Sequence, residues 1–166
     1  MALKDALLPE FDHEMGVTRK LLERVPDADL GWKPHHKSFS LGDLAAHLAQ
    51  IPHWSAAILD RPSYDIETVE SGDRTSPTRG ADVVAAFDQA VAAARARLSS
   101  KSDGELMAPW TLKKGGQDMF TAPALAAFKS FIVNHSIHHR GQLSVYLRLR
   151  NVPLPSMYGP TADEPM

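Results

Sequence analysis

The segment "NHSIHHRGQL", residues 134–143, places three histidines within five residues. His135 and His139 are four residues apart, so on a helix they lie about one turn apart on the same face. Two imidazoles arranged in this way can bind one divalent ion, as H-x-x-x-H pairs do on zinc-binding helices. His138 falls about 60° from His135 at the edge of that face. The spacing therefore favours His135 and His139 as metal ligands and leaves His138 outside the site.

A stable site needs at least a third ligand, and His47 is the best candidate. It shares the apolar face of a predicted helix with four hydrophobic side chains: Leu44, Leu48, Ile51 and Trp54. The remaining histidines lie off that face, in a loop or toward solvent: His13, His35, His36 and His53. Burying three imidazoles without a partner costs roughly 1–3 kcal/mol for each unsatisfied group. We therefore predict a metal site formed by His47, His135 and His139.

Four long segments have hydrophobic residues at helical spacing and would position these ligands: 3–25, 40–58, 82–98 and 123–150. Ser40 and Asp43 resemble a capping box at the start of the second helix, and Pro52 should kink that helix. We predict an all-α fold, a four-helix bundle formed by one domain spanning residues 1–166.

The segments between the predicted helices are of two kinds. Residues 61–79 form a long polar connection between the second and third helices. Residues 99–120 form an irregular crossover before the fourth helix, and their paired glycines also fit a small hairpin. The proline-rich C-terminal segment, residues 151–166, cannot be helical. No strand-rich region is expected.

Other polar residues near the histidine pair have weaker roles. Gln142 shares its helical face and is a candidate to orient a bound water, although a core hydrogen bond fits equally well. Tyr146 is a second weak catalytic candidate, with packing as the alternative. Arg140 should point away from the site and pair with Asp163 or Glu164 of the returning C-terminal segment. These assignments are hypotheses about catalysis, whereas the three histidines form the predicted metal site.

Composition excludes several classes of function. The 166 residues carry a net charge of −2, so no global basic field attracts nucleic acid or an anionic membrane. The chain contains no cysteine, which excludes disulfides, thiolate ligands and a cysteine nucleophile. No apolar stretch approaches a membrane span, and the N-terminus lacks the features of a signal peptide. We therefore expect a cytoplasmic protein without nucleic-acid or membrane partners.

The residues around the histidines resemble a known family. "NHSIHHRGQLSVYLRLRNVPLPSMYGPTADE" closely resembles the C-terminal signature of the DinB family of YfiT-like four-helix proteins. "SFSLGDLAAHLAQIPHW" resembles the family's second-helix signature, and "WTLKKGGQDMFTAPALAAF" is similar to the segment before its last helix. The resemblance thus covers nearly the whole chain.

The resemblance implies a divalent metal ion, variously nickel, zinc, iron or manganese, held by one histidine of the second helix and two of the last. In this sequence these are His47, His135 and His139. It also implies a homodimer. The wider superfamily includes transferases and isomerases that depend on a low-molecular-weight thiol such as bacillithiol or mycothiol, but no residue here identifies a thiol-binding subgroup.

Two functional hypotheses follow. The first is a metal-dependent enzyme, a hydrolase or a small-thiol S-transferase, that acts on a small-molecule substrate at open metal positions. The second is a non-catalytic, stress-linked metal-binding bundle in which the ion only holds helices together. An open coordination position favours the first hypothesis, and loss of stability without turnover favours the second.

Overall fold

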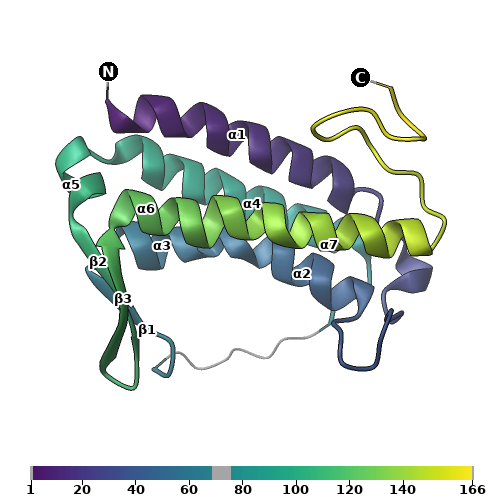
Figure 1. Ribbon diagram of the computed structural model, residues 1–166, viewed down its shortest axis with the longest axis horizontal. Helices are drawn as coiled ribbons and strands as arrows, with labels where there is room; N and C mark the ends of the chain where they lie inside the picture. Colours follow the sequence, from purple (N-terminus) through teal and green to yellow (C-terminus); the bar gives the residue numbers. More distant parts are fainter. Residues whose placement is uncertain (1, 69–75, 166) are drawn as a thin grey trace.

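The computed structural model describes residues 2–68 and 76–165 and is mostly helical, with a small three-stranded sheet (Figure 1). The α-helices are α1 (Leu3–Leu22), α2 (Leu41–Gln50), α3 (Trp54–Leu59), α4 (Gly80–Ser100), α5 (Asp103–Met107), α6 (Ala124–Phe128) and α7 (His135–Leu149). Short helical turns of other types are η1 (Asp27–Asp29), η2 (Ile51–His53) and the π-helical η3 (Lys129–Asn134). The strands are β1 (Ser63–Asp65), β2 (Pro109–Lys114) and β3 (Gln117–Pro123). The predicted all-α class is correct for most of the chain, but that prediction did not include the three-stranded sheet.

The hydrophobic core lies between the long helices. Helices α1 and α2 each pack against both α4 and α7. Their almost fully buried side chains include Phe11, Leu48, Phe87 and Leu143, and Phe128 of α6 joins the same core. The sheet lies at one end of these helices and the C-terminal segment at the other (Figure 1). Within the described ranges, no helix combines the length and apolar character needed to cross a membrane.

The start and the interruption of the second helical segment follow from local sequence. Ser40 caps α2, because its hydroxyl accepts a hydrogen bond of 3.0 Å from the backbone amide of Asp43. Pro52 lacks an amide hydrogen and lies within η2, which separates α2 from α3. The predicted cap and kink are both confirmed. They place His47 on α2 and Trp54 at the start of α3.

The predicted crossover contains both a short helix, α5, and the β2–β3 hairpin. Gly115 and Gly116 form its turn with φ values of 56° and 79°, a region that side chains disfavour. The Asp65 carboxylate accepts hydrogen bonds from both glycine amides, at 3.0 and 2.6 Å. Together with a bond from the Glu67 amide, the largest contribution, these bonds lower the pKa of Asp65. The glycine pair therefore forms the hairpin that the sequence allowed as an alternative.

The interpretation of residues 61–79 as a polar connection was incomplete. Ser63–Asp65 form β1, which pairs in parallel with β2 and brings the chain after α3 against the hairpin. Only three residues pair, so no alternation of polar and apolar side chains could reveal this strand. The remainder of that prediction falls partly on residues 69–75, which lie outside the described residues.

The last helical segment is not one regular helix. Its central turn, η3, is π-helical and ends directly before His135. The buried face of α7 consists of Ser136, Arg140, Leu143 and Leu147. The helical face that Gln142 shares with the two histidines is therefore not the buried face of α7: Gln142 is exposed, as is Leu149 further along the helix, at 55%. The leucines at 143 and 147 define the core face, so His135 and His139 lie at its edge, partly buried.

The C-terminal segment does fold back onto the helices, but not through the predicted ion pair. Arg140 is only 2% exposed and binds the carboxylate of Glu14 on α1 at 2.6 Å. The Tyr158 hydroxyl donates to the same carboxylate at 2.6 Å, which ties the segment to this buried pair. Asp163 pairs instead with Arg148, at 2.5 Å. The prediction for Arg140 was wrong because its side chain faces α1 and not the solvent.

Candidate metal centre

Three imidazoles from two helices converge on one point. The Nε2 atom of His47 lies 3.4 Å from that of His135 and 3.1 Å from that of His139. The Nε2 atoms of His135 and His139 are 2.9 Å apart. Nitrogens bound to one ion at about 2.0–2.1 Å lie about 2.9 Å apart at a right angle and about 3.4 Å apart at the tetrahedral angle. The observed triangle spans this range, so the three histidines could hold a metal ion.

Hydrogen bonding among the rings does not account for this triangle. Each imidazole nitrogen has either one proton or one lone pair, directed in the plane of its ring. Three Nε2 atoms that point at a common centre cannot form three separate hydrogen bonds with one another. Converging lone pairs are instead the arrangement that a cation requires. The donor set therefore fits a divalent ion.

Contacts at the outer side of the two α7 histidines orient their rings. The Nδ1 atom of His139 lies 2.8 Å from the amide oxygen of Gln142, which can only accept, so Nδ1 carries the proton and Nε2 the lone pair. The amide nitrogen of Gln142 lies 3.2 Å from the His138 ring. The His135 ring is hydrogen-bonded to the backbone of Phe131, one turn earlier. These outer contacts are those that fix the tautomer of metal-binding histidines.

The electrostatic environment keeps these rings neutral. Partial burial is the main cause that lowers the pKa of His135, and the neighbouring His139 lowers it further. Burial is also the main cause that lowers the pKa of His139. A neutral imidazole is the form that binds metal, so both residues are in the ligating state at neutral pH.

These pKa shifts predict how the stability of the metal-free protein depends on pH. Because the folded-state pKa values lie below the ordinary value of about 6.5, the unfolded chain binds more protons once the pH falls below it. The free energy of unfolding should therefore decrease on acidification from about pH 7.5 to about pH 5.5. Urea titrations with chelator present measure this change. The variant with His135→Asn and His139→Asn should lose less stability, and an equal loss would contradict the prediction.

Gln142 should tune the affinity of the site. Gln142→Ala removes the hydrogen bond at the outer nitrogen of His139, and metal affinity should fall about tenfold. Competition with a chromophoric chelator measures the dissociation constant. Val145→Ala, an exposed substitution on the same helix, is the control and should leave affinity unchanged. Gln142→Glu should retain affinity, because a carboxylate accepts the same hydrogen bond.

The two weak catalytic candidates have other contacts in the structure. Gln142 is exposed, and its amide bonds the outer nitrogen of His139 and the ring of His138. Tyr146 packs edge-on against the ring of Trp32, with centroids 5.8 Å apart. The structure thus brings together the three predicted ligands and does not place either candidate among them. His138 is exposed, as predicted.

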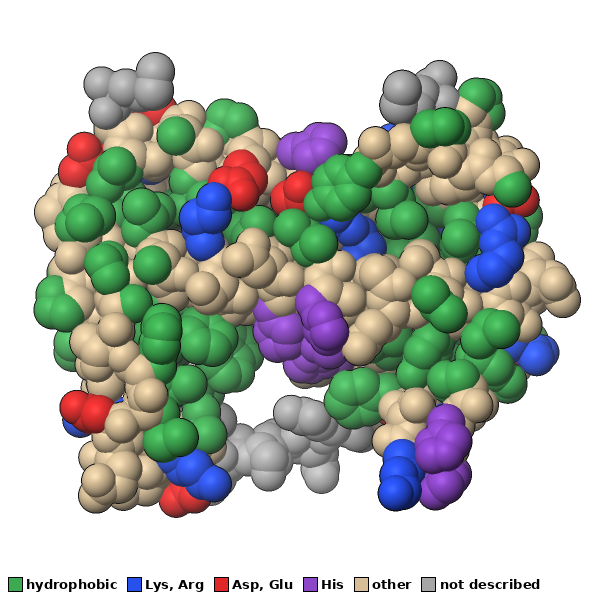
Figure 2. Space-filling model, in the orientation of Figure 1, with side chains coloured by type: hydrophobic (Ala, Val, Ile, Leu, Met, Phe, Trp, Pro, Cys, Tyr) green, Lys and Arg blue, Asp and Glu red, His purple; other side chains and the backbone are tan. Residues whose placement is uncertain are grey.

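The sequence did not indicate the aromatic surroundings of the site. The Phe39 ring lies 5.9 Å from that of His47 and is 44% exposed. Phe131 lies one turn before His135 on the other side. Histidine side chains gather near the centre of the face in Figure 2, above a hollow flanked by hydrophobic side chains. The only sequence signal for Phe39 is its position directly before the cap of α2.

Comparisons with known proteins identify one relative by sequence and two solved structures by fold. An uncharacterized protein, YrdA, of Bacillus subtilis strain 168 is 25% identical over 167 residues, covering 96% of this chain and 90% of the relative. A DinB-like protein from Bacillus cereus ATCC 10987 has a similar fold, with a TM-score of 0.71 and 22% identity over 93% of this chain and 97% of that one. The DinB-like protein YjoA of Bacillus subtilis gives a TM-score of 0.68 and 19% identity, covering 90% and 96%.

The family assignment depends on the match over the whole sequence. The family model described as "DinB family" matches residues 1–165. The solved structures support the fold, and the family model supports the relationship that the histidine motifs suggested. The chain therefore belongs to the DinB family.

Proposed function

We propose that His47, His135 and His139 bind one divalent ion through Nε2 and that this ion is the centre of an enzyme acting on a small molecule. One observation carries the proposal. Among the described residues, no further histidine or carboxylate joins the cluster, and the sequence contains no cysteine. Three protein ligands leave coordination positions open, which distinguishes catalytic from structural zinc sites.

The reaction class follows from the charge and the donors. An ion held here would act as a Lewis acid and lower the pKa of a coordinated water or thiol. Three neutral imidazoles add no negative charge, so the site favours an anionic ligand. Any thiol must come from a small molecule, because the chain has none. We therefore propose hydrolysis or S-transfer from a low-molecular-weight thiol, with nickel, zinc, iron or manganese as the ion.

A second candidate function follows from the two helices that carry the three histidines. His47 lies on α2 and the other two on α7, so an ion would bridge these helices. Such an ion could serve only to hold a four-helix bundle together in a stress-linked protein. For either function, we propose that the protein is a cytoplasmic homodimer without nucleic-acid or membrane partners.

Activity assays with and without the site distinguish the two functions. Protein loaded with each of the four metals is tested for hydrolysis of aryl esters and for conjugation of small thiols with aryl halides. We expect one metal to give turnover roughly 100-fold above that of His139→Ala. Equal turnover by both proteins across the panel, with a metal-dependent rise in melting temperature, would reject the enzyme and support the structural bundle.

A further inference from the structure

A cavity opens along the end of α2, α3 and β1. Its volume is about 530 Å³, within the range of small-molecule sites. Five of its lining residues have polar or aromatic side chains: Gln50, His53, Trp54, Arg61 and Tyr64. None of these residues belongs to the metal centre itself.

The cavity is related to the metal centre by position on α2 and by one ring contact. Gln50 follows His47 by three residues on α2, so the two side chains occupy neighbouring positions on the helix. The Trp54 ring stacks on that of Phe131, with centroids 6.1 Å apart and planes inclined by 19°. Phe131 in turn accepts the hydrogen bond from the His135 ring through its backbone. The cavity thus begins at Gln50, about one helical turn along α2 from His47.

Two aromatic rings form the apolar part of the cavity. The rings of Trp54 and Tyr64 lie 5.3 Å apart at an angle of 48°, and both are only partly buried. Trp54 is supported from behind by Phe131, so its exposed edge is held in place. Rigid aromatic side chains with free surface favour a flat apolar ligand at low entropic cost.

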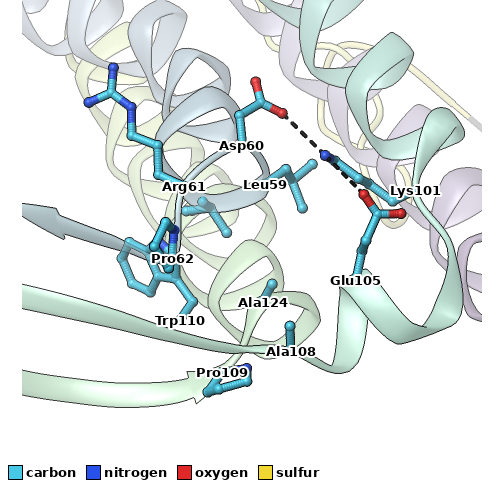
Figure 3. Close-up of a pocket in the computed structure, with 11 residues that line it drawn as sticks. Leu59, Asp60, Arg61, Pro62, Lys101, Glu105, Ala108, Pro109, Trp110 and Ala124 are labelled. Atoms are coloured by element: carbon cyan, nitrogen blue, oxygen red, sulfur yellow. Dashed lines mark hydrogen bonds and ion pairs between the residues drawn. The ribbon is translucent and has the colours of Figure 1, made fainter.

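Arg61 adds a positive charge to this cavity. In Figure 3, which shows a neighbouring pocket, Asp60 and Glu105 surround Lys101, and Arg61 extends away from these three residues. Lys101 pairs with Asp60 at 3.4 Å and with Glu105 at 3.5 Å. Arg97 also pairs with Asp60, at 2.9 Å, so both carboxylates have positively charged partners other than Arg61. In the part of the chain that the structure describes, no carboxylate forms an ion pair with Arg61. Its guanidinium is available to an anion.

We propose that this cavity binds the body of the substrate, a flat aromatic molecule with an anionic group. Trp54 and Tyr64 contact the ring, and Arg61 binds the anion as a charge-assisted donor. The inference rests on the proposed function, because it places the reactive group of the same molecule at the metal centre. Arg61 and Trp54 are thereby specificity-determining residues.

Binding of a probe tests the cavity without metal. Calorimetry with 2-naphthoate and the neutral 2-naphthalenemethanol is performed on His139→Ala protein treated with chelator. In this His139→Ala background, the further substitution Arg61→Gln should weaken naphthoate binding about tenfold and leave the affinity for the neutral probe unchanged. Adding Trp54→Leu should weaken both probes about tenfold. Arg79→Gln, which removes an exposed guanidinium before α4, is the matched control and should change neither.

A second measurement tests the connection to the metal. With manganese-loaded wild-type protein, naphthoate protons should show enhanced relaxation that Arg61→Gln reduces. The inference is overturned if Arg61→Gln behaves like Arg79→Gln, or if naphthoate shows no enhancement although manganese is bound. Failure of the proposed function differs from both results, because then no ion binds or the bound ion gives no turnover, while naphthoate binding still depends on Arg61.

Discussion

Replacing His135 by alanine should reduce the bound metal from about one ion per chain to background, because two ligands remain from a three-histidine set. The Nε2 atom of His135 lies within 3.4 Å of those of both other ligands, and no further histidine or carboxylate among the described residues joins the cluster. Elemental analysis after equilibration with zinc or nickel and removal of free ion measures the content.

His138→Ala is the matched control for this loss. It removes an exposed histidine from the same motif. The His138 ring packs edge-on against that of His139, with centroids 4.8 Å apart, but its nitrogen contacts Gln142 and is not part of the nitrogen triangle. Its metal content should stay near that of the wild type. Equal loss in the two variants, or a wild type that carries no more metal than His135→Ala, would show that these histidines do not form the site.

Arg140→Ala should destabilise the protein by about 3–5 kcal/mol, the cost of leaving one partner of a buried ion pair uncompensated. Arg140 is 2% exposed and Glu14 7% exposed. The arginine also donates to the Glu14 carbonyl and to Thr18, at 2.9 and 3.2 Å. Its loss would leave the Glu14 carboxylate buried between α1, α7 and the C-terminal segment without a positively charged partner. Urea unfolding measures the free energy.

Arg148→Ala is the control, because its pair with Asp163 lies at the surface and should contribute far less to stability. If Arg140→Ala does not fold, Arg140→Met with Glu14→Leu removes both charges. This double variant should be more stable than either single replacement. Equal effects of Arg140→Ala and Arg148→Ala would contradict the buried network.

The three-histidine cluster could be predicted because two of its members have a local geometry and the third shares the apolar face of a clearly marked helix. His135 and His139 lie within one regular helix, where a spacing of four residues determines their relative position. His47 lies on a helix whose start is marked by Ser40. The prediction that these three residues meet is confirmed by the distances among them. Their binding of an ion remains a proposal.

The features that were predicted incorrectly depend on contacts between distant segments. The π-helical turn of η3 has no recognised sequence signal here. Helical spacing groups Gln142 with the histidines on one face of the last helix, whereas Leu143 and Leu147 face the core. Arg140 is buried because Glu14 faces it from α1, a contact across 126 residues. A strand as short as β1 forms only because the hairpin supplies its partner. Each requires knowledge of tertiary packing.

Diffraction from crystals grown with one equivalent of nickel or zinc, measured at the absorption edge of the metal, tests the central claim most directly. We expect a single anomalous peak about 2.0–2.2 Å from the Nε2 atoms of His47, His135 and His139, with no fourth protein ligand. A peak elsewhere, no peak at this triangle, or a fourth side chain closing the coordination would contradict the proposed open metal centre.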